Sequence, residues 1–283
     1  MTVCRPYAFR EVFHWCERTQ DKPSQTYRMY SQENILMSLV QGQEGRAWAM
    51  DLKGWKKDNI YVCDWDYIVC DAYQTTVTGI QMSQADFYGT LPSELGMLVT
   101  LEEISMRRNL IFGKIPHEIA NLPHLEKIFL AENRLTGTVP NFSSYKLKTI
   151  DMAYNLFSGT LDPYLVQLNP QLRQLDLASN KIEGTIPVSF ENAEKLLTLS
   201  LSQNKLTGTI HNFFGTKPSI NYLYLDGNFL MGTIPQTFSG KSSNIRELWL
   251  QDNQLTGTIP PEIGTISDLF NFYIDGRFFF QIH

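Results

Sequence analysis

One pattern recurs along the chain and limits its fold more than any other feature of the sequence. It reads LEKIFLAENRLTGTVP at 125–140, LRQLDLASNKIEGTIP at 172–187 and IRELWLQDNQLTGTIP at 245–260. Its asparagine returns every 22 to 25 residues, at Asn109, Asn133, Asn155, Asn180, Asn204, Asn228 and Asn253. Ala85 takes this place in a first copy, giving eight copies, and a degenerate ninth begins at Leu269. Such a period predicts a solenoid in which each copy is one rung.

Each position of the pattern has a physical reason. The leucines alternate on a short strand and point inwards, while the residues between them point out. The asparagine amide both donates and accepts, so a column of asparagines is expected to pair backbone groups of the turns as a ladder. The glycine permits an unusual backbone conformation or a close approach. The Ile-Pro step favours an extended path before a short helical turn, as in Pro116–Leu125.

The ending x-L-x-G-x-I-P, as in Thr256–Pro260, resembles the plant-specific class of leucine-rich repeats. That class occurs in receptor-kinase ectodomains and polygalacturonase-inhibitor-like proteins, and the pattern is also similar to secreted or membrane-anchored proteins of diatoms and other algae. The resemblance covers about Leu36 to Ile274. It implies a right-handed α/β repeat solenoid with a concave parallel β-sheet, short helical or 3-10 turns on the convex side, and recognition outside the cell. His211 in place of proline, and Leu161-Asp162 in place of Ile-Pro, depart from the pattern.

The segment before the repeats resembles the N-terminal cap of the same family. Cys63, Trp65, Val69 and Cys70 hold the positions of the cap motif. Upstream, Ser31–Trp48 is predicted as an amphipathic helix that buries Ile35, Leu36, Leu39 and Val40. Trp48, Trp55 and Trp65 are expected to cover the first repeat.

Four cysteines lie outside the repeats, as the pairs Cys4/Cys16 and Cys63/Cys70. Two close pairs favour two disulfides and an oxidising compartment. A metal site is the weaker interpretation, because no C-x-x-C occurs and the histidines are scattered. Residues 1–30 do not match the cap; they are interpreted as a helix pinned by Cys4–Cys16 or as the remnant of a preceding stalk.

Four regions follow from these patterns. They are an N-terminal extension at 1–30, the cap at 31–76, eight repeats at 77–268, and a degenerate ninth repeat or C-terminal cap at 269–283.

A net charge of −5 gives no basic field for nucleic acid or anionic lipid. No apolar run is long enough for a transmembrane helix, and the start lacks the apolar core of a signal peptide. We therefore expect a processed chain or a fragment of a longer one, placed outside the cell or at its surface.

A ligand site is predicted on the concave face, at its C-terminal third. The residues are Tyr222, Tyr224, Asp226, Trp249, Asp252, Tyr273 and Asp275. Exposed aromatic side chains with polar neighbours are typical of interfaces and of sugar-stacking surfaces. The alternative is that these rings only stack on one another and stabilise the rungs. Arg107 and Arg108 form a smaller basic spot opposite Glu132.

Asn141-Phe142-Ser143 is a glycosylation sequon in a shortened loop, where it is expected at the surface. A mass shift on endoglycosidase treatment tests this expectation.

Nothing in the sequence indicates catalysis. Asp151 and Asp176 are expected on neighbouring rungs about 5 Å apart, but glycosidases place such carboxylates in a cleft that holds the sugar. Nucleophile-elbow, Walker-type, HExxH and dinucleotide motifs are missing from the sequence. We expect no catalytic residues, no cofactor and no metal.

The prediction for the whole chain is a non-enzymatic extracellular module that binds a protein, peptide or glycan, with no nucleic-acid partner. The alternative is a structural or adhesive spacer of a cell wall or surface; an intracellular scaffold is disfavoured by the cysteine pairs.

Overall fold

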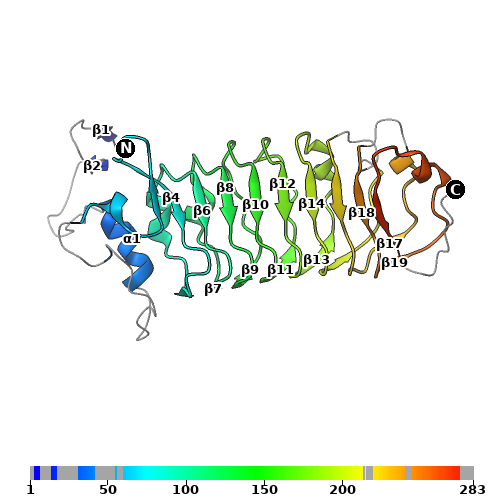
Figure 1. Cartoon of the computed structure of the whole chain (residues 1–283), viewed down its shortest axis with the longest axis horizontal. Helices are drawn as coiled ribbons and strands as arrows, with labels where there is room; N and C mark the ends of the chain where they lie inside the picture. Colours follow the sequence, from blue (N-terminus) through cyan, green and yellow to red (C-terminus); the bar gives the residue numbers. More distant parts are fainter. Residues whose placement is uncertain are drawn as a thin grey trace.

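The computed structural model describes residues 3–6, 14–17, 31–41, 55, 60–212, 214, 219–239 and 244–274. The rungs stack in one row from the cap to the last strand, β20 (Asn271–Tyr273), and form an elongated body (Figure 1). The predicted solenoid is therefore confirmed.

The first sheet has ten strands, one from the cap and one from each rung. In spatial order they are β3 (Ile68–Cys70), β4 (Val77–Gln81), β6 (Glu103–Ser105), β8 (Lys127–Phe129), β10 (Thr149–Asp151), β12 (Gln174–Asp176), β14 (Thr198–Ser200), β16 (Tyr222–Tyr224), β18 (Glu247–Trp249) and β20. The β3–β4 pair is antiparallel, and all other neighbours in this sheet are parallel. The degenerate ninth copy thus adds a strand in register, and we call the solvent side of this sheet the first-sheet face.

A second parallel sheet, which the sequence did not lead us to expect, follows the asparagine of each rung. Its strands are β5 (Tyr88–Gly89), β7 (Leu110–Gly113), β9 (Arg134–Gly137), β11 (Leu156–Thr160), β13 (Lys181–Thr185) and β15 (Lys205–Thr207), and β17 (Met231–Gly232) with β19 (Gln254–Leu255) continues the row as a separate pair. A bridge between Thr209 and Met231 links the two groups. Figure 1 shows β7, β9, β11 and β13 along one edge of the body.

The asparagine ladder joins each rung to the one before it. In Asn204, Oδ1 accepts from the backbone N–H of Ile182 at 3.0 Å, and Nδ2 donates to the carbonyl of Leu177 at 2.9 Å. The same two contacts recur from Asn109 to Asn253. Each asparagine thereby pairs backbone groups that would otherwise be buried without partners, as predicted.

The repeated glycines serve both purposes that the pattern suggested. Gly184 has φ +81°, a left-handed conformation that favours glycine. A Cβ built on it would lie 2.8 Å from Cγ2 of Thr160 in the preceding rung. Thr185 stands in the same relation to Gly208. The threonine methyl of one rung therefore packs against the glycine of the next.

The core runs the whole length of the row. Leucines of the strands, such as Leu199 and Leu201, are fully buried. Phe190, Phe214 and Phe238 follow at steps of 24 residues and are also buried. Burying one such side chain stabilises the fold by roughly 2 kcal/mol. Short helical turns line the core on the side of these phenylalanines. They are η2 (Ser93–Met97), α2 (His117–Ala120), η3 (Val188–Asn192), η4 (Gln236–Ser239) and η5 (Pro261–Thr265).

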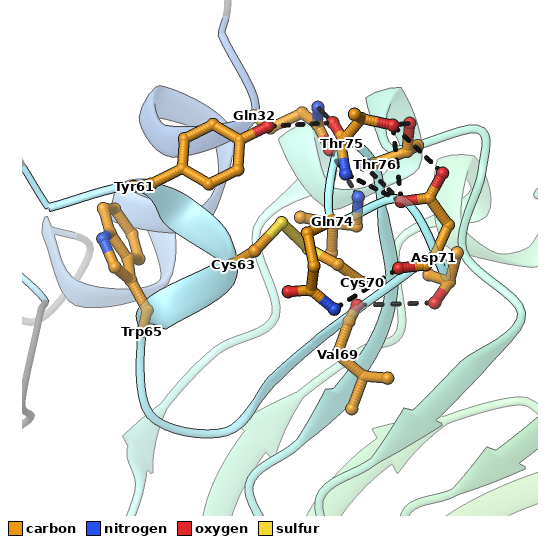
Figure 2. The surroundings of a disulfide bond; sticks show 12 residues. Gln32, Tyr61, Cys63, Trp65, Val69, Cys70, Asp71, Gln74, Thr75 and Thr76 are labelled. Carbon is orange, nitrogen blue, oxygen red and sulfur yellow. Dashed lines mark hydrogen bonds between the residues drawn. A yellow bond between two sulfur atoms is a disulfide. The ribbon is translucent and has the colours of Figure 1, made fainter.

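The cap closes the N-terminal end of the core around a disulfide (Figure 2). Cys63 on η1 (Val62–Asp64) bonds to Cys70 at the end of β3, as the resemblance implied. The predicted helix is α1 (Gln32–Gln41), which buries Ile35, Leu36 and Leu39. Trp55 and Trp65 are buried with ring centroids 4.8 Å apart. Trp48 and the side chain of Val40 lie outside the described residues.

Hydrogen bonds from backbone N–H groups to side-chain oxygens tie α1 to the first rung and hold the loop after the disulfide. The backbone N–H of Val77 in β4 donates to Gln32 Oε1 of α1 at 2.7 Å. Asp71, next to the disulfide, accepts from the backbone N–H groups of Thr75 and Thr76 (Figure 2). The bond from Thr75 lowers the pKa of the Asp71 carboxyl.

The helix hypothesis for residues 1–30 is wrong for the described residues of that stretch. They form two antiparallel strands, β1 (Val3–Pro6) and β2 (His14–Glu17). A proline at the end of β1 is incompatible with a continuous helix through this segment. The register places Cys4 opposite Cys16. Their side chains lie outside the described part of the chain, so the second disulfide stays a prediction.

Candidate functional site

The outward residues of the first sheet form a straight column across all rungs. In register they are Gln81, Ser105, Phe129, Asp151, Asp176, Ser200, Tyr224, Trp249 and Tyr273. This is the order that the repeat pattern predicts for the central outward position of each strand. Because adjacent strands lie about 5 Å apart, neighbouring members of the column are in side-chain contact range.

Three aromatic rings follow one another at the C-terminal end of this column. The centroid of Trp249 lies 5.1 Å from those of both Tyr224 and Tyr273, with interplanar angles of 80° and 74°. Tyr222 stands two residues before Tyr224 on β16 and is paired in register with Glu247. We call Tyr222, Tyr224, Trp249 and Tyr273 the C-terminal aromatic patch. Tyr273 is 47% exposed, and the other three are half-buried.

Polar groups beside the patch are partly fixed and partly unpaired. Tyr224 donates its hydroxyl to Glu247 Oε2 at 2.9 Å. Burial raises the pKa of Tyr224, and the hydrogen bond to Glu247 raises it further, so the phenol stays a donor at neutral pH. Within the described part of the chain, the buried atoms Trp249 Nε1 and Gln251 Oε1 have no hydrogen-bond partner. Unpaired buried polar groups are rare in folded proteins.

The predicted acidic residues of the site differ in their surroundings. Asp226 is buried and accepts hydrogen bonds from Ser202 Oγ and Gln203 Nε2 in the preceding rung. It therefore braces two rungs as well as lining the face. Asp252 is exposed and has φ 55°, at the turn just before the ladder asparagine. Asp275 lies outside the described residues.

Asp151 and Asp176 pair in register on neighbouring strands, as expected. Each accepts a hydrogen bond from the backbone N–H two residues later, at Ala153 and Ala178. Asp151 is 7% exposed, and burial raises the pKa of its carboxyl; Arg107 opposes this rise and Asp176 adds to it. The pair lies in the middle of the first-sheet face.

The predicted basic spot opposite Glu132 needs a correction. Arg108 does pair with Glu132, its Nε 2.8 Å from Oε1. Arg107 does not; its Nη2 lies 2.5 Å from Asp151 Oδ2, two rungs away. The reason is local geometry: Arg108 has φ 53° at the left-handed turn position, so consecutive side chains leave the strand in different directions.

The described residues offer neither a metal-binding cluster nor a membrane-spanning helix. Among the described residues, no group of three or more His, Cys, Asp or Glu side chains is placed to hold a metal ion. None of the helices in the described ranges is long and apolar enough to span a bilayer.

Exposed apolar side chains on the second sheet were missed by the sequence reasoning. Tyr88 and Phe112 are 36% and 38% exposed, with centroids 5.2 Å apart. Leu110 pairs in register with Tyr88 and is also exposed. The signal was present in the alternation x-L-x-G-x, whose odd positions point outwards on a strand.

Comparisons with known proteins agree with this geometry. Models of the leucine-rich repeat match residues 170–230 and 244–266. The Arabidopsis receptor kinase HAESA, solved with the peptide hormone IDA and the co-receptor SERK1, is 29% identical over 85% of this chain, with a TM-score of 0.76. The ectodomain of the receptor kinase GASSHO1/SCHENGEN3 from Arabidopsis thaliana, solved with CASPARIAN STRIP INTEGRITY FACTOR 2, is 25% identical over 86% of this chain, with a TM-score of 0.67.

Coverage differs between these structures. This chain spans 41% of the HAESA chain and 35% of the GASSHO1/SCHENGEN3 chain. A plant ice-binding protein is matched over 94% of its length at 23% identity and a TM-score of 0.61, which shows a shared fold alone. Curated protein sequences give no match.

Proposed function

Since the chain is a leucine-rich-repeat protein similar to plant receptor ectodomains, we propose that it is a non-enzymatic recognition module outside the cell. Its ligand is a peptide or a protein segment, and the binding site is the C-terminal aromatic patch with its acidic neighbours.

The observation that carries the proposal is the unbroken row of Tyr224, Trp249 and Tyr273. Large aromatic side chains dominate the energy of most protein interfaces when a partner covers them. Their polar neighbours, Glu247 and Asp252, supply the hydrogen-bonding rim that such interfaces have. The rival explanation is that edge-to-face contacts, worth about 1 kcal/mol each, only stabilise the rungs.

The comparisons support a peptide or protein rather than a sugar ligand. HAESA was solved in complex with the peptide hormone IDA, and GASSHO1/SCHENGEN3 in complex with CASPARIAN STRIP INTEGRITY FACTOR 2. The acidic side chains Glu247, Asp252 and Asp226 favour a ligand that carries basic groups.

The test compares a Tyr224→Ala, Trp249→Ala double variant with the wild type on an array of synthetic peptides and on a glycan array. Hits are then measured by titration calorimetry. We expect a loss of about 2 kcal/mol or more, which is roughly a 30-fold weaker Kd. Tyr154→Ala is the matched control, because Tyr154 is 62% exposed and lies outside the patch.

Undiminished affinity in a folded double variant would show that the patch is only structural. Binding to glycans but to no peptide would overturn the ligand class. Thermal melting accompanies each measurement, so that a loss of binding is separated from a loss of fold.

A further inference from the structure

The third rung is shorter than its neighbours at one defined place. Asn133 and Asn155 are 22 residues apart, whereas the preceding step is 24 and the following one 25. In five other rungs a helical turn begins eight residues after the ladder position, for example at His117 for α2 and at Val188 for η3. Asn141 occupies this position in the third rung, and residues 138–144 form no helical turn.

This short segment is held firmly while its asparagine stays outside. Phe142 is fully buried in the core, whereas Asn141 and Ser143 on either side are exposed. The backbone N–H of Ser143 donates to the carbonyl of Ala120 at 3.0 Å, and Ser143 Oγ donates to Asn121 Oδ1 at 2.9 Å. The buried phenylalanine therefore anchors the loop and fixes the outward direction of its neighbours.

Asn141-Phe142-Ser143 is the single N-x-S/T sequence in the chain. We propose that Asn141 carries an N-linked glycan. It is the one asparagine with the acceptor motif, it is exposed, and it stands where the missing helical turn leaves room for a bulky group. The proposal rests on passage through the secretory route, which is part of the proposed function.

The chemistry needs a lipid-diphosphate-linked oligosaccharide as donor. A bond forms between Nδ2 of Asn141 and the anomeric carbon of the sugar, the bond from that carbon to the diphosphate breaks, and Nδ2 loses one proton. The remaining N–H can keep the hydrogen bond to Asp162 Oδ2, which is 2.6 Å in the free amide. Asp162, which replaces the proline of the pattern, thereby orients the linkage.

The position has a consequence for recognition. Asn141 lies at the level of the helical turns, between the second sheet and β10, and not on the first-sheet face. A glycan there shields the side of the third to fifth rungs and leaves the C-terminal aromatic patch uncovered.

The test uses the full chain, secreted from eukaryotic cells behind a foreign signal sequence. Intact mass is measured before and after peptide-N-glycosidase, and peptide mapping locates the aspartate that the enzyme leaves. We expect a glycan on the wild type and on Ser143→Thr, and none on Asn141→Gln or Ser143→Ala. Ser143→Ala keeps the Asn141–Asp162 contact, so it separates loss of the acceptor motif from loss of the fold.

A matched positive control is Glu194→Ser, which creates an acceptor motif at the exposed Asn192 of η3. Equal masses for the wild type and Asn141→Gln, with a glycan on the control, would overturn the proposal. Forced secretion makes this outcome independent of whether the aromatic patch binds a peptide.

Discussion

Arg107 reaches across two rungs, and its Nη2 lies 2.5 Å from Oδ2 of Asp151. The guanidinium passes over the ring of Phe129, 4.3 Å from its centroid. Three consecutive rungs are thereby linked by an ion pair and a cation–π contact. The pair is unequal in exposure, since the Arg107 side chain is 42% exposed and that of Asp151 is 10% exposed.

Arg107→Ala should destabilise the fold markedly, because it leaves the Asp151 carboxylate buried without its counter-charge. We expect a loss of about 2 kcal/mol in the free energy of unfolding, less than for a fully buried pair because Arg107 is partly screened by solvent. Urea unfolding measures this loss. The control is Arg108→Ala, whose exposed pair with Glu132 should cost below ~1 kcal/mol. Equal losses in the two variants would contradict the assignment.

The raised pKa of Asp151 predicts a pH dependence with a defined sign. Its carboxyl has a folded-state pKa above the ordinary value of 3.8, because burial disfavours the charge. Between these two values the folded state binds more protons than the unfolded state, so this group's contribution to stability falls as pH rises through the window. Asp151→Asn should remove this slope from a plot of unfolding free energy against pH. Arg107→Ala should extend the window upwards, because Arg107 lowers that pKa.

Asn204→Ala should disrupt the ladder. The variant loses the acceptor for Ile182 N–H and the donors to Leu177 and Leu201. Leaving such groups buried and unpaired costs about 1–3 kcal/mol each, so we expect a total of at least ~3 kcal/mol. Chemical denaturation checks it, with the exposed Asn192→Ala as control. A change below ~1 kcal/mol would mean that water enters and replaces the amide.

The sequence predicts the columns of this fold well, and the reason is visible at Ala85 and Asn141. Variation in step length is absorbed in the loops, as at Asn141, while strand and asparagine stay in register. Even Ala85, which lacks the amide, keeps its place because its backbone N–H donates to Asn109. Periodicity therefore carries both the ladder and the order of the exposed column.

Contacts that cross rungs obliquely could not be predicted in this way. The partner of Arg107 depends on the reach of a long side chain over Phe129, which no period encodes. The second sheet was missed because its strands are short and most of them contain glycine, a residue that is depleted in strands. The edge-to-face geometry of Trp249 likewise comes from packing with its neighbours.

Gly184→Ala tests whether the threonine–glycine contact sets the spacing of the second sheet. The new Cβ meets Cγ2 of Thr160 at 2.8 Å and the residue keeps φ +81°, so strain and steric overlap add. We expect a loss of about 2–4 kcal/mol in the free energy of unfolding. Gly264→Ala is the control: a Cβ there has no heavy atom within 4 Å, and it should change stability by less than ~1 kcal/mol.

Thr160→Ala in the Gly184→Ala background separates the two causes. Removing Cγ2 relieves the overlap but not the backbone strain, so the double variant should regain part of the lost stability. Thr160 is exposed, and Thr160→Ala alone should cost no more than about 0.5 kcal/mol. Strict additivity of the two substitutions in urea unfolding would mean that the methyl group does not limit the approach of the rungs, and that the left-handed φ alone requires glycine.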